Sequence, residues 1–131
     1  MSQETLLAFD FGEKKIGVAI GNSLLRIASP LEIILSEIRT IRFNRINQLL
    51  KKWMPDRVIV GLSINNISES DRLSKQRCCR FANQLRAYYK LRVELVDEFA
   101  SSCEAQEILG NNHHDDALAA SVILQRYLNS I

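Results

Sequence analysis

The stretch that decides the fold runs from residue 6 to residue 21 and reads Leu6-Leu7-Ala8-Phe9-Asp10-Phe11-Gly12-Glu13-Lys14-Lys15-Ile16-Gly17-Val18-Ala19-Ile20-Gly21. Its pattern predicts a buried strand that ends in an acid, then a tight turn and a second strand. Gly12 gives the chain the freedom to turn back. Gly17 and Gly21 allow close backbone approach or a bulge in the return strand. The stretch therefore predicts a hairpin at the start of the fold.

Asp10 is the chemically informative residue of this hairpin. It ends an apolar run, where a carboxylate is costly to desolvate unless something positive is held beside it. Lys14 and Lys15 lie at the predicted tip, where they can meet a phosphate. The arrangement indicates a metal and phosphate site. A hairpin with a merely solvated tip explains the same segment equally well.

Composition indicates an ordinary globular protein. The 131 residues fit one compact domain over 1–131, and the 47% apolar and 24% charged residues are typical of soluble proteins. No apolar run approaches the roughly 20 residues that span a bilayer. Met1-Ser2-Gln3-Glu4 lacks the basic lead of a signal peptide. We therefore expect a cytoplasmic protein with no membrane partner.

Cysteine spacing and net charge add two limits. Cys78, Cys79 and Cys103 fit neither a zinc site nor a disulfide framework, so we expect reduced thiols, with Cys78 packed inside a helix. The 17 Lys and Arg residues exceed the 15 Asp and Glu residues by only two. A nucleic-acid partner must therefore be argued from local patches.

The hydrophobic periodicity changes several times along the chain. It predicts strands over 24–35, 57–61 and 92–97, and helices over 40–54, 71–90, a short stretch from Ser101, and 115–128. The interruption of the first of these strands by Ser29-Pro30 suits an edge strand or a bulge. The inner stripes of the first two helices are expected to be Ile46, Leu49, Leu50 and Trp53, and Leu73, Phe81, Leu85 and Tyr88. With the opening hairpin, this order predicts an α/β fold. Its mixed five-stranded sheet has three antiparallel strands followed by parallel βα units, flanked by helices.

Three acids are expected at one edge of this sheet. Asp10 ends the first strand, and Asp97-Glu98 ends the last, at the edge where ligands of such sheets bind. Asp116 begins the last helix on the face shared by Ala120, Ile123 and Tyr127, while Asp115 is rotated about 100° away. Stabilisation of the helix N-terminus is the structural alternative for both of these aspartates.

Four motifs in the chain resemble, in order, those of the YqgF/RuvX family. They are Asp10-Phe11-Gly12-Glu13-Lys14-Lys15-Ile16-Gly17-Val18-Ala19, Gly61-Leu62-Ser63-Ile64-Asn65, Asp97-Glu98-Phe99-Ala100-Ser101-Ser102, and Asp116-Ala117-Leu118-Ala119-Ala120 with Ile123-Leu124-Gln125. The family has a ribonuclease H-like fold and is described as pre-16S rRNA nucleases or Holliday junction resolvases. The resemblance covers nearly the whole chain.

The resemblance implies a metal-dependent nuclease acting in 5′-end maturation of pre-16S rRNA. Asp10, Glu98 and Asp116 would be the catalytic residues and would hold Mg²⁺ or Mn²⁺, with Asp97 as the substitute for Glu98. Carboxylate oxygens suit such hard ions. Residues expected to contact nucleic acid are Lys14, Lys15, Asn65, Arg72 and Lys75. A solvated helix face explains Arg72 and Lys75 equally well.

The chain departs from the family pattern at several positions. Phe99 stands where the family has an arginine, and Ser63 replaces a proline. The stretch before Asp116 is short and carries His113 and His114, which are candidates for a general acid or base but are equally compatible with mere exposure.

Other functions are also compatible with the sequence. They are a Holliday junction resolvase-like DNA endonuclease acting on branched DNA, a non-catalytic RNA-binding module of ribosome assembly, and an ATPase of the actin-like group. The last needs two such domains around a cleft, which 131 residues cannot supply. Either a monomer or a homodimer fits the sequence.

Overall fold

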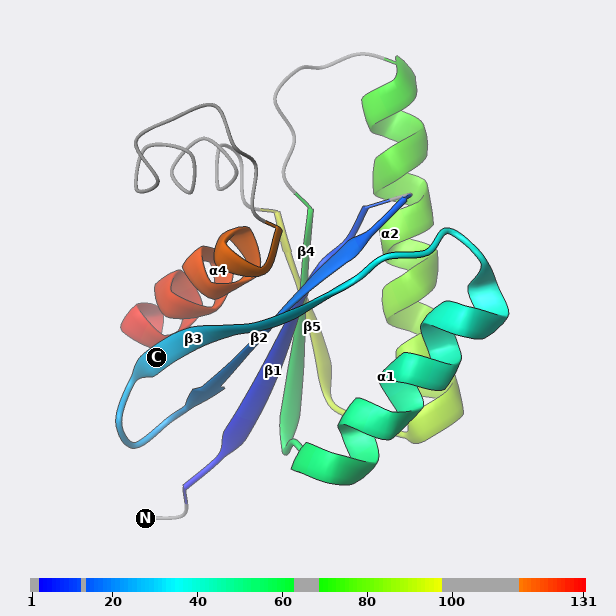
Figure 1. Ribbon diagram of the computed structural model, residues 1–131. Helices are drawn as coiled ribbons and strands as arrows, with labels where there is room; N and C mark the ends of the chain where they lie inside the picture. Colours follow the sequence, from blue (N-terminus) through cyan, green and yellow to red (C-terminus); the bar gives the residue numbers. More distant parts are fainter. Residues whose placement is uncertain (1–2, 13, 63–68, 98–115) are drawn as a thin grey trace.

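One mixed sheet forms the centre of the molecule (Figure 1). The computed structural model describes residues 3–12, 14–62, 69–97 and 116–131. The strands are β1 (Thr5–Asp10), β2 (Ile16–Asn22), β3 (Ile27–Ile34), β4 (Arg57–Leu62) and β5 (Val93–Asp97), in the order β3-β2-β1-β4-β5. The helices are α1 (Arg39–Trp53), α2 (Glu69–Tyr89) and α4 (Asp116–Ser130). The predicted five-stranded mixed sheet is therefore confirmed.

Strand β1 lies at the centre of the sheet. It pairs antiparallel with β2 and parallel with β4, which pairs parallel with β5. The turn from β1 to β2 requires glycine at position 12, since a Cβ there would lie 2.4 Å from the carbonyl oxygen of Lys15. That oxygen belongs to the backbone and cannot move aside as a flexible side chain can. The predicted hairpin therefore closes as expected.

Strand β3 is an edge strand with a bulge, as the Ser29-Pro30 interruption predicted. Val18 pairs with Glu32 and Ala19 with Pro30, so β3 carries one extra residue at this point. The predicted start at residue 24 is wrong, and the strand begins at Ile27. Residues 23–26 form a turn because the Asn22 side chain accepts hydrogen bonds from the backbone N–H groups of Leu24 and Leu25.

The two faces of the sheet carry separate cores. Leu7 and Phe9 of β1 pack with residues of α1 and α2, whereas Leu6 and Ala8 pack with residues of α4. Figure 1 shows α1 and α2 on one side of the sheet and α4 on the other. Because successive side chains of a strand alternate between faces, Asp10 belongs with Leu6 and Ala8 on the α4 face.

The predicted inner stripes of the first two helices are mostly confirmed. Phe81 and Leu85 are buried, as are Ile46, Leu49 and Leu50, while Trp53 is half-buried. The predicted burial of Leu73 and Tyr88 is wrong, because these residues are 50% and 54% exposed. Leu73 precedes the buried Cys78 by five residues, which at 3.6 residues per turn places it about 140° away around the helix. Tyr88 lies at the edge of the stripe.

The helix boundaries of the sequence prediction differ from the observed ones by at most two residues. The short helix predicted from Ser101 lies outside the described residues. Among the helices that the structure describes, none combines the length and the apolar character that a membrane span requires.

Candidate active site at the carboxyl edge of the sheet

Asp10 is a buried carboxylate at the end of the central strand. Its residue is only 5% exposed, and its register partners are Gly17 on β2 and Gly61 on β4. Neither register partner carries a side chain, so the neighbours of Asp10 along this row of the sheet are glycines. A carboxylate buried at the end of a strand is suited to holding a small positively charged ligand, because a charge taken out of water is costly unless it is paired.

Helix α4 crosses the sheet directly beside this row. A Cβ on Gly61 would lie 2.8 Å from Cδ1 of Ile123, so the helix rests on the glycine backbone. Asp116 begins α4 seven residues, or about two turns, before Ile123. In Figure 1 the first turn of α4 lies at the edge where β1, β4 and β5 end.

The burial on α4 agrees with the sequence prediction. Ala120 and Ile123 are fully buried and Tyr127 is half-buried. The side chain of Asp116 is not among those described. The backbone nevertheless brings the start of α4 and the end of β1 to one edge of the sheet, on the face to which Asp10 belongs.

The alternation along β5 bears on the choice between Asp97 and Glu98. Val93 is buried in the core beneath α1 and α2, whereas Val96 packs against the core beneath α4. Asp97 ends β5 opposite Leu62 and stands four residues after Val93 in the sequence. Glu98 follows it in the sequence and lies outside the described residues.

An arginine that the sequence prediction missed anchors the turn after Asp10. Arg42 of α1 is 7% exposed, and one terminal nitrogen of its guanidinium donates a 2.6 Å hydrogen bond to the carbonyl oxygen of Gly12. Its Nε donates to the carbonyl oxygen of Ser36, and the guanidinium lies 5.7 Å from the centre of the Phe11 ring. The sequence did indicate that Arg42 points inward, because Arg42 precedes the buried Ile46 by one turn and so shares its face.

The backbone of the same turn is also tied to β4. The Phe11 N–H donates a 2.9 Å hydrogen bond to the carbonyl oxygen of Gly61. The chain that leaves Asp10 is therefore held from two sides, by β4 through Phe11 and by α1 through Arg42. Such support fixes the position of a carboxylate better than a loop alone can.

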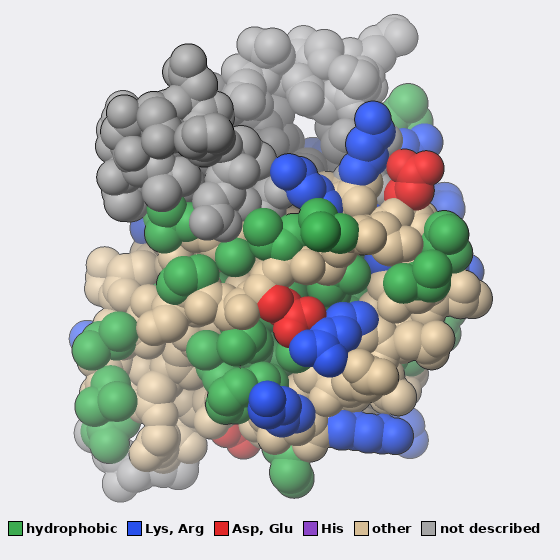
Figure 2. Space-filling model, in the orientation of Figure 1, with side chains coloured by type: hydrophobic (Ala, Val, Ile, Leu, Met, Phe, Trp, Pro, Cys, Tyr) green, Lys and Arg blue, Asp and Glu red, His purple; other side chains and the backbone are tan. Residues whose placement is uncertain are grey.

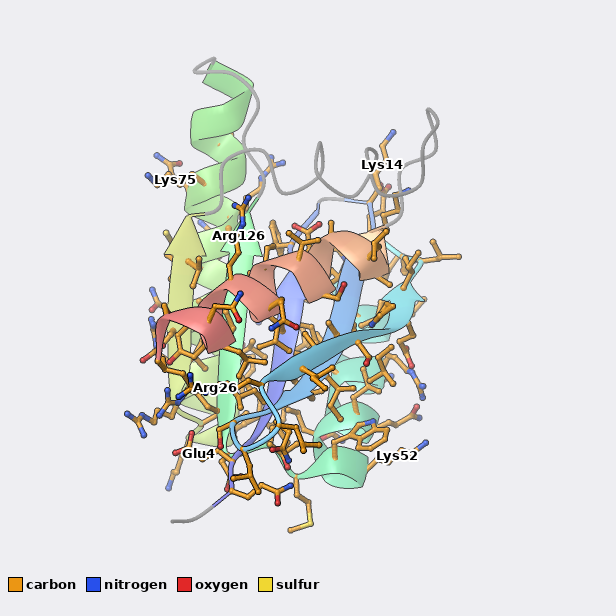
Figure 3. The ribbon with its side chains drawn as sticks, turned by 90° about the vertical axis from the view of Figure 1, so that its left-hand side faces the viewer. Glu4, Lys14, Arg26, Lys52, Lys75 and Arg126 are labelled. Atoms are coloured by element: carbon orange, nitrogen blue, oxygen red, sulfur yellow. The ribbon has the colours of Figure 1, made fainter. Side chains whose placement is uncertain are left out.

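The predicted nucleic-acid contacts are only partly described. Lys14 is exposed and Lys15 half-buried beside the hairpin turn, and Lys75 is exposed on α2. Figure 3 shows Lys14 and Lys75 toward the same end of the molecule, the end at which β1 terminates. Arg72 belongs to α2 without a described side chain, and Asn65 lies outside the described residues.

A metal cluster cannot be assembled from the described side chains alone. Among them, no group of three His, Cys, Asp or Glu residues lies close enough to hold an ion. Glu98 and the side chain of Asp116, the two predicted companions of Asp10, fall outside that set, as do His113, His114 and Phe99.

Comparison with known sequences finds one family across nearly the whole chain. Residues 4–130 match the family described as "RuvX: Holliday junction resolvase". A protein of Bordetella petrii named "Putative pre-16S rRNA nuclease" is 62% identical over 131 residues, covering 100% of this chain and 99% of that protein. A protein of the same name from Paraburkholderia phytofirmans is 45% identical over 133 residues, covering 98% and 90%.

Comparison with solved structures finds the same fold at low sequence identity. RuvC of T. thermophilus, in complex with a Holliday junction substrate, matches with a TM-score of 0.58 and 16% identity, covering 97% of this chain and 94% of that one. The Fowlpox virus Holliday junction resolvase matches with a TM-score of 0.51 and 16% identity, covering 97% and 99%. The ribonuclease H-like fold predicted from the sequence is therefore confirmed.

Proposed function

The chain belongs to the RuvX family, and from that membership we propose that it is a nuclease that hydrolyses phosphodiester bonds with the help of divalent metal ions. The observation that carries the proposal is the position of Asp10. This buried carboxylate ends the central strand between two glycines, on the face of the sheet over which α4 begins.

We propose Asp10, Glu98 and Asp116 as the catalytic and metal-binding residues. We favour Glu98 over Asp97 because Glu98 stands two residues after Val96 in the sequence, and Val96 packs on the α4 side. Asp116 begins α4 about two turns before Ile123, which rests on the strand neighbouring Asp10. Three carboxylates would thus come from β1, from the end of β5 and from α4.

The donor set fits Mg²⁺ or Mn²⁺. Both are hard ions that prefer carboxylate oxygen and retain several waters, so a few acids are enough. Such ions, when bound, stabilise negative charge on the attacking and leaving oxygens of a phosphodiester. Asp10 supplies a carboxylate whose position is held by Phe11 and Arg42, as described above.

For the substrate we propose an RNA precursor of the 16S ribosomal RNA. The support is the name of a relative that is 62% identical over the whole chain. Such a substrate would place the activity in the cytoplasm. The second candidate is branched DNA, favoured by the description of the family and by the fold shared with a resolvase bound to a Holliday junction.

A cleavage assay tests the proposal. End-labelled precursor RNA and four-way DNA junctions are incubated with the protein and Mn²⁺, Mg²⁺ or EDTA, beside the Asp10→Asn variant. We expect cut RNA with either metal, none with EDTA and none with the variant. Junction cleavage without RNA cleavage would favour the second candidate. Binding without any metal-dependent cleavage would contradict the nuclease proposal and leave a non-catalytic RNA-binding module.

A further inference from the structure

A basic groove lies between α1 and α2, on the opposite side of the sheet from α4. Its volume is about 500 Å³, and the side chains that line it include Arg39, Arg42, Arg77, Arg80, Glu37 and Phe43. Four guanidinium groups face one carboxylate, which leaves an excess of three positive charges in the lining. Because the whole chain carries a net charge of only +2, the groove concentrates charge that composition alone does not reveal.

The arginines of the groove differ in their existing partners. The guanidinium of Arg42 is buried and donates to Gly12 and Ser36, so it anchors the wall. Arg39 donates to the Tyr88 hydroxyl and lies 5.7 Å from the centre of the Phe43 ring. An arginine has five N–H donors, so Arg39 keeps several for a ligand.

The opposite wall comes from α2. Arg77 and Arg80 stand three residues apart, nearly one helical turn, and both are exposed. In Figure 2 most Lys and Arg side chains lie over the half of the molecule that carries α1 and α2. Guanidinium groups on two facing helices suit the repeated phosphates of a nucleic-acid strand.

The lining of the groove includes aromatic side chains, one of which adjoins the candidate active site. Phe11 lines the groove and directly follows Asp10 in the sequence. Phe43, also in the lining, is half-buried and offers part of its ring. A positively charged groove with aromatic side chains is the usual way in which proteins hold a single strand, because phosphates meet the cations and unstacked bases meet the rings.

We propose that this groove binds the phosphodiester backbone of a single-stranded segment of the RNA, outside the bond that is cut. The proposal rests on the proposed nuclease function, because it takes the strand to continue from the edge at Asp10 past Phe11 into the groove. Arg39 and Arg80 contact phosphates, and Arg42 holds the wall in place.

The test measures binding separately from cleavage. Fluorescence anisotropy follows a labelled single-stranded RNA in EDTA over a series of salt concentrations, for the wild type and for Arg39→Gln/Arg80→Gln. The control is Lys51→Gln/Lys52→Gln, which removes the same charge from exposed residues in the last turn of α1. Thermal melts verify that both variants fold.

We expect the groove variant to bind more weakly and to lower the slope of log affinity against log salt by about 1.4, since each phosphate of a single strand that is no longer neutralised lowers it by about 0.7. The control should keep the wild-type slope, and Arg39→Lys/Arg80→Lys should keep most of it. Equal losses of affinity in the groove and control variants would overturn the proposal, because only net charge would then matter.

The outcomes also separate the two proposals. Groove-dependent RNA binding without any metal-dependent cleavage would contradict the nuclease function alone. Metal-dependent cleavage with unchanged binding by the groove variant would contradict the groove alone.

Discussion

Ile123 of α4 packs on Gly61 of β4 so closely that a Cβ on the glycine would lie 2.8 Å from its Cδ1 and 3.1 Å from its Cγ2. Gly61 is also the register partner of Asp10. The same glycine therefore gives the carboxylate a bare neighbour and lets α4 approach the sheet. One residue couples the position of the helix that begins at Asp116 to the strand that ends at Asp10.

Gly61→Ala is expected to push α4 away from the sheet. Overpacking of a buried contact costs about 1–3 kcal/mol, and we expect a loss of stability in that range together with a larger fractional loss of cleavage. Chemical denaturation and a cleavage assay measure the two effects. Ile123→Val removes Cδ1, so the double variant should be more stable than the sum of the single effects predicts. Additive losses of stability would show that this packing does not limit the approach of α4.

Arg42→Met is expected to destabilise the turn after Asp10. The substitution removes the donors of two carbonyl oxygens, Gly12 and Ser36, and hydrogen bonds to charged groups are worth about 1.5–3 kcal/mol each. We expect a loss of about 3–6 kcal/mol in the free energy of unfolding, measured by chemical denaturation.

Arg45→Met is the matched control on the same helix. Arg45 is exposed, and its Nε donates a 2.7 Å hydrogen bond to Glu32. Exposed pairs of this kind contribute at most about 1 kcal/mol. If Arg42→Met costs no more than Arg45→Met, the buried anchor is not what holds the turn.

Asp116→Asn should reduce cleavage far more than Asp115→Asn. Both changes remove one negative charge at the start of α4, so their effects on the helix dipole and on the melting temperature should be similar. Only Asp116 stands seven residues before Ile123, close to two full turns, and this spacing is why we expect the larger effect at Asp116. Equal losses of activity would place the helix in a different register with respect to Asp10.

Tyr127, near the C-terminal end of α4, should make the free energy of unfolding depend on pH. Burial raises the pKa of the Tyr127 phenol, and its hydrogen bond with Glu94 raises it further, against the opposing effect of Arg57. The unfolded chain therefore loses this proton first, so stability should fall as pH rises above about 10, the ordinary value for tyrosine. Tyr127→Phe should show a shallower fall in denaturation curves measured from about pH 9 to about pH 11. Parallel curves would argue against this assignment.

The sheet could be predicted because its signals are local. The apolar run from Leu6 to Asp10, the turn glycine Gly12 and the apolar run of β4 each specify a strand or a turn without reference to distant residues. The Ser29-Pro30 interruption likewise marked β3 as an edge strand, since proline cannot donate to a ladder. The order of elements along the chain then gave the mixed sheet.

The groove and the anchor could not be predicted in the same way. Arg39 with Arg42, and Arg77 with Arg80, are each visible in the sequence as pairs three residues apart. Which faces of α1 and α2 oppose one another depends on how the helices pack on the sheet, which is a tertiary property. The prediction that Leu73 lies on the inner face of α2 was wrong for a related reason. A helix as long as α2 carries apolar residues on its exposed side as well.

The central claim is that Asp10 is part of a site for divalent metal ions, and titration calorimetry with Mn²⁺ tests it most directly. Wild-type protein should release or absorb heat on binding Mn²⁺, and Asp10→Asn should abolish that signal without lowering the melting temperature. Glu37→Gln, which removes an exposed carboxylate on the other side of the sheet, should bind Mn²⁺ like the wild type. Undiminished Mn²⁺ binding by a folded Asp10→Asn variant would contradict the account.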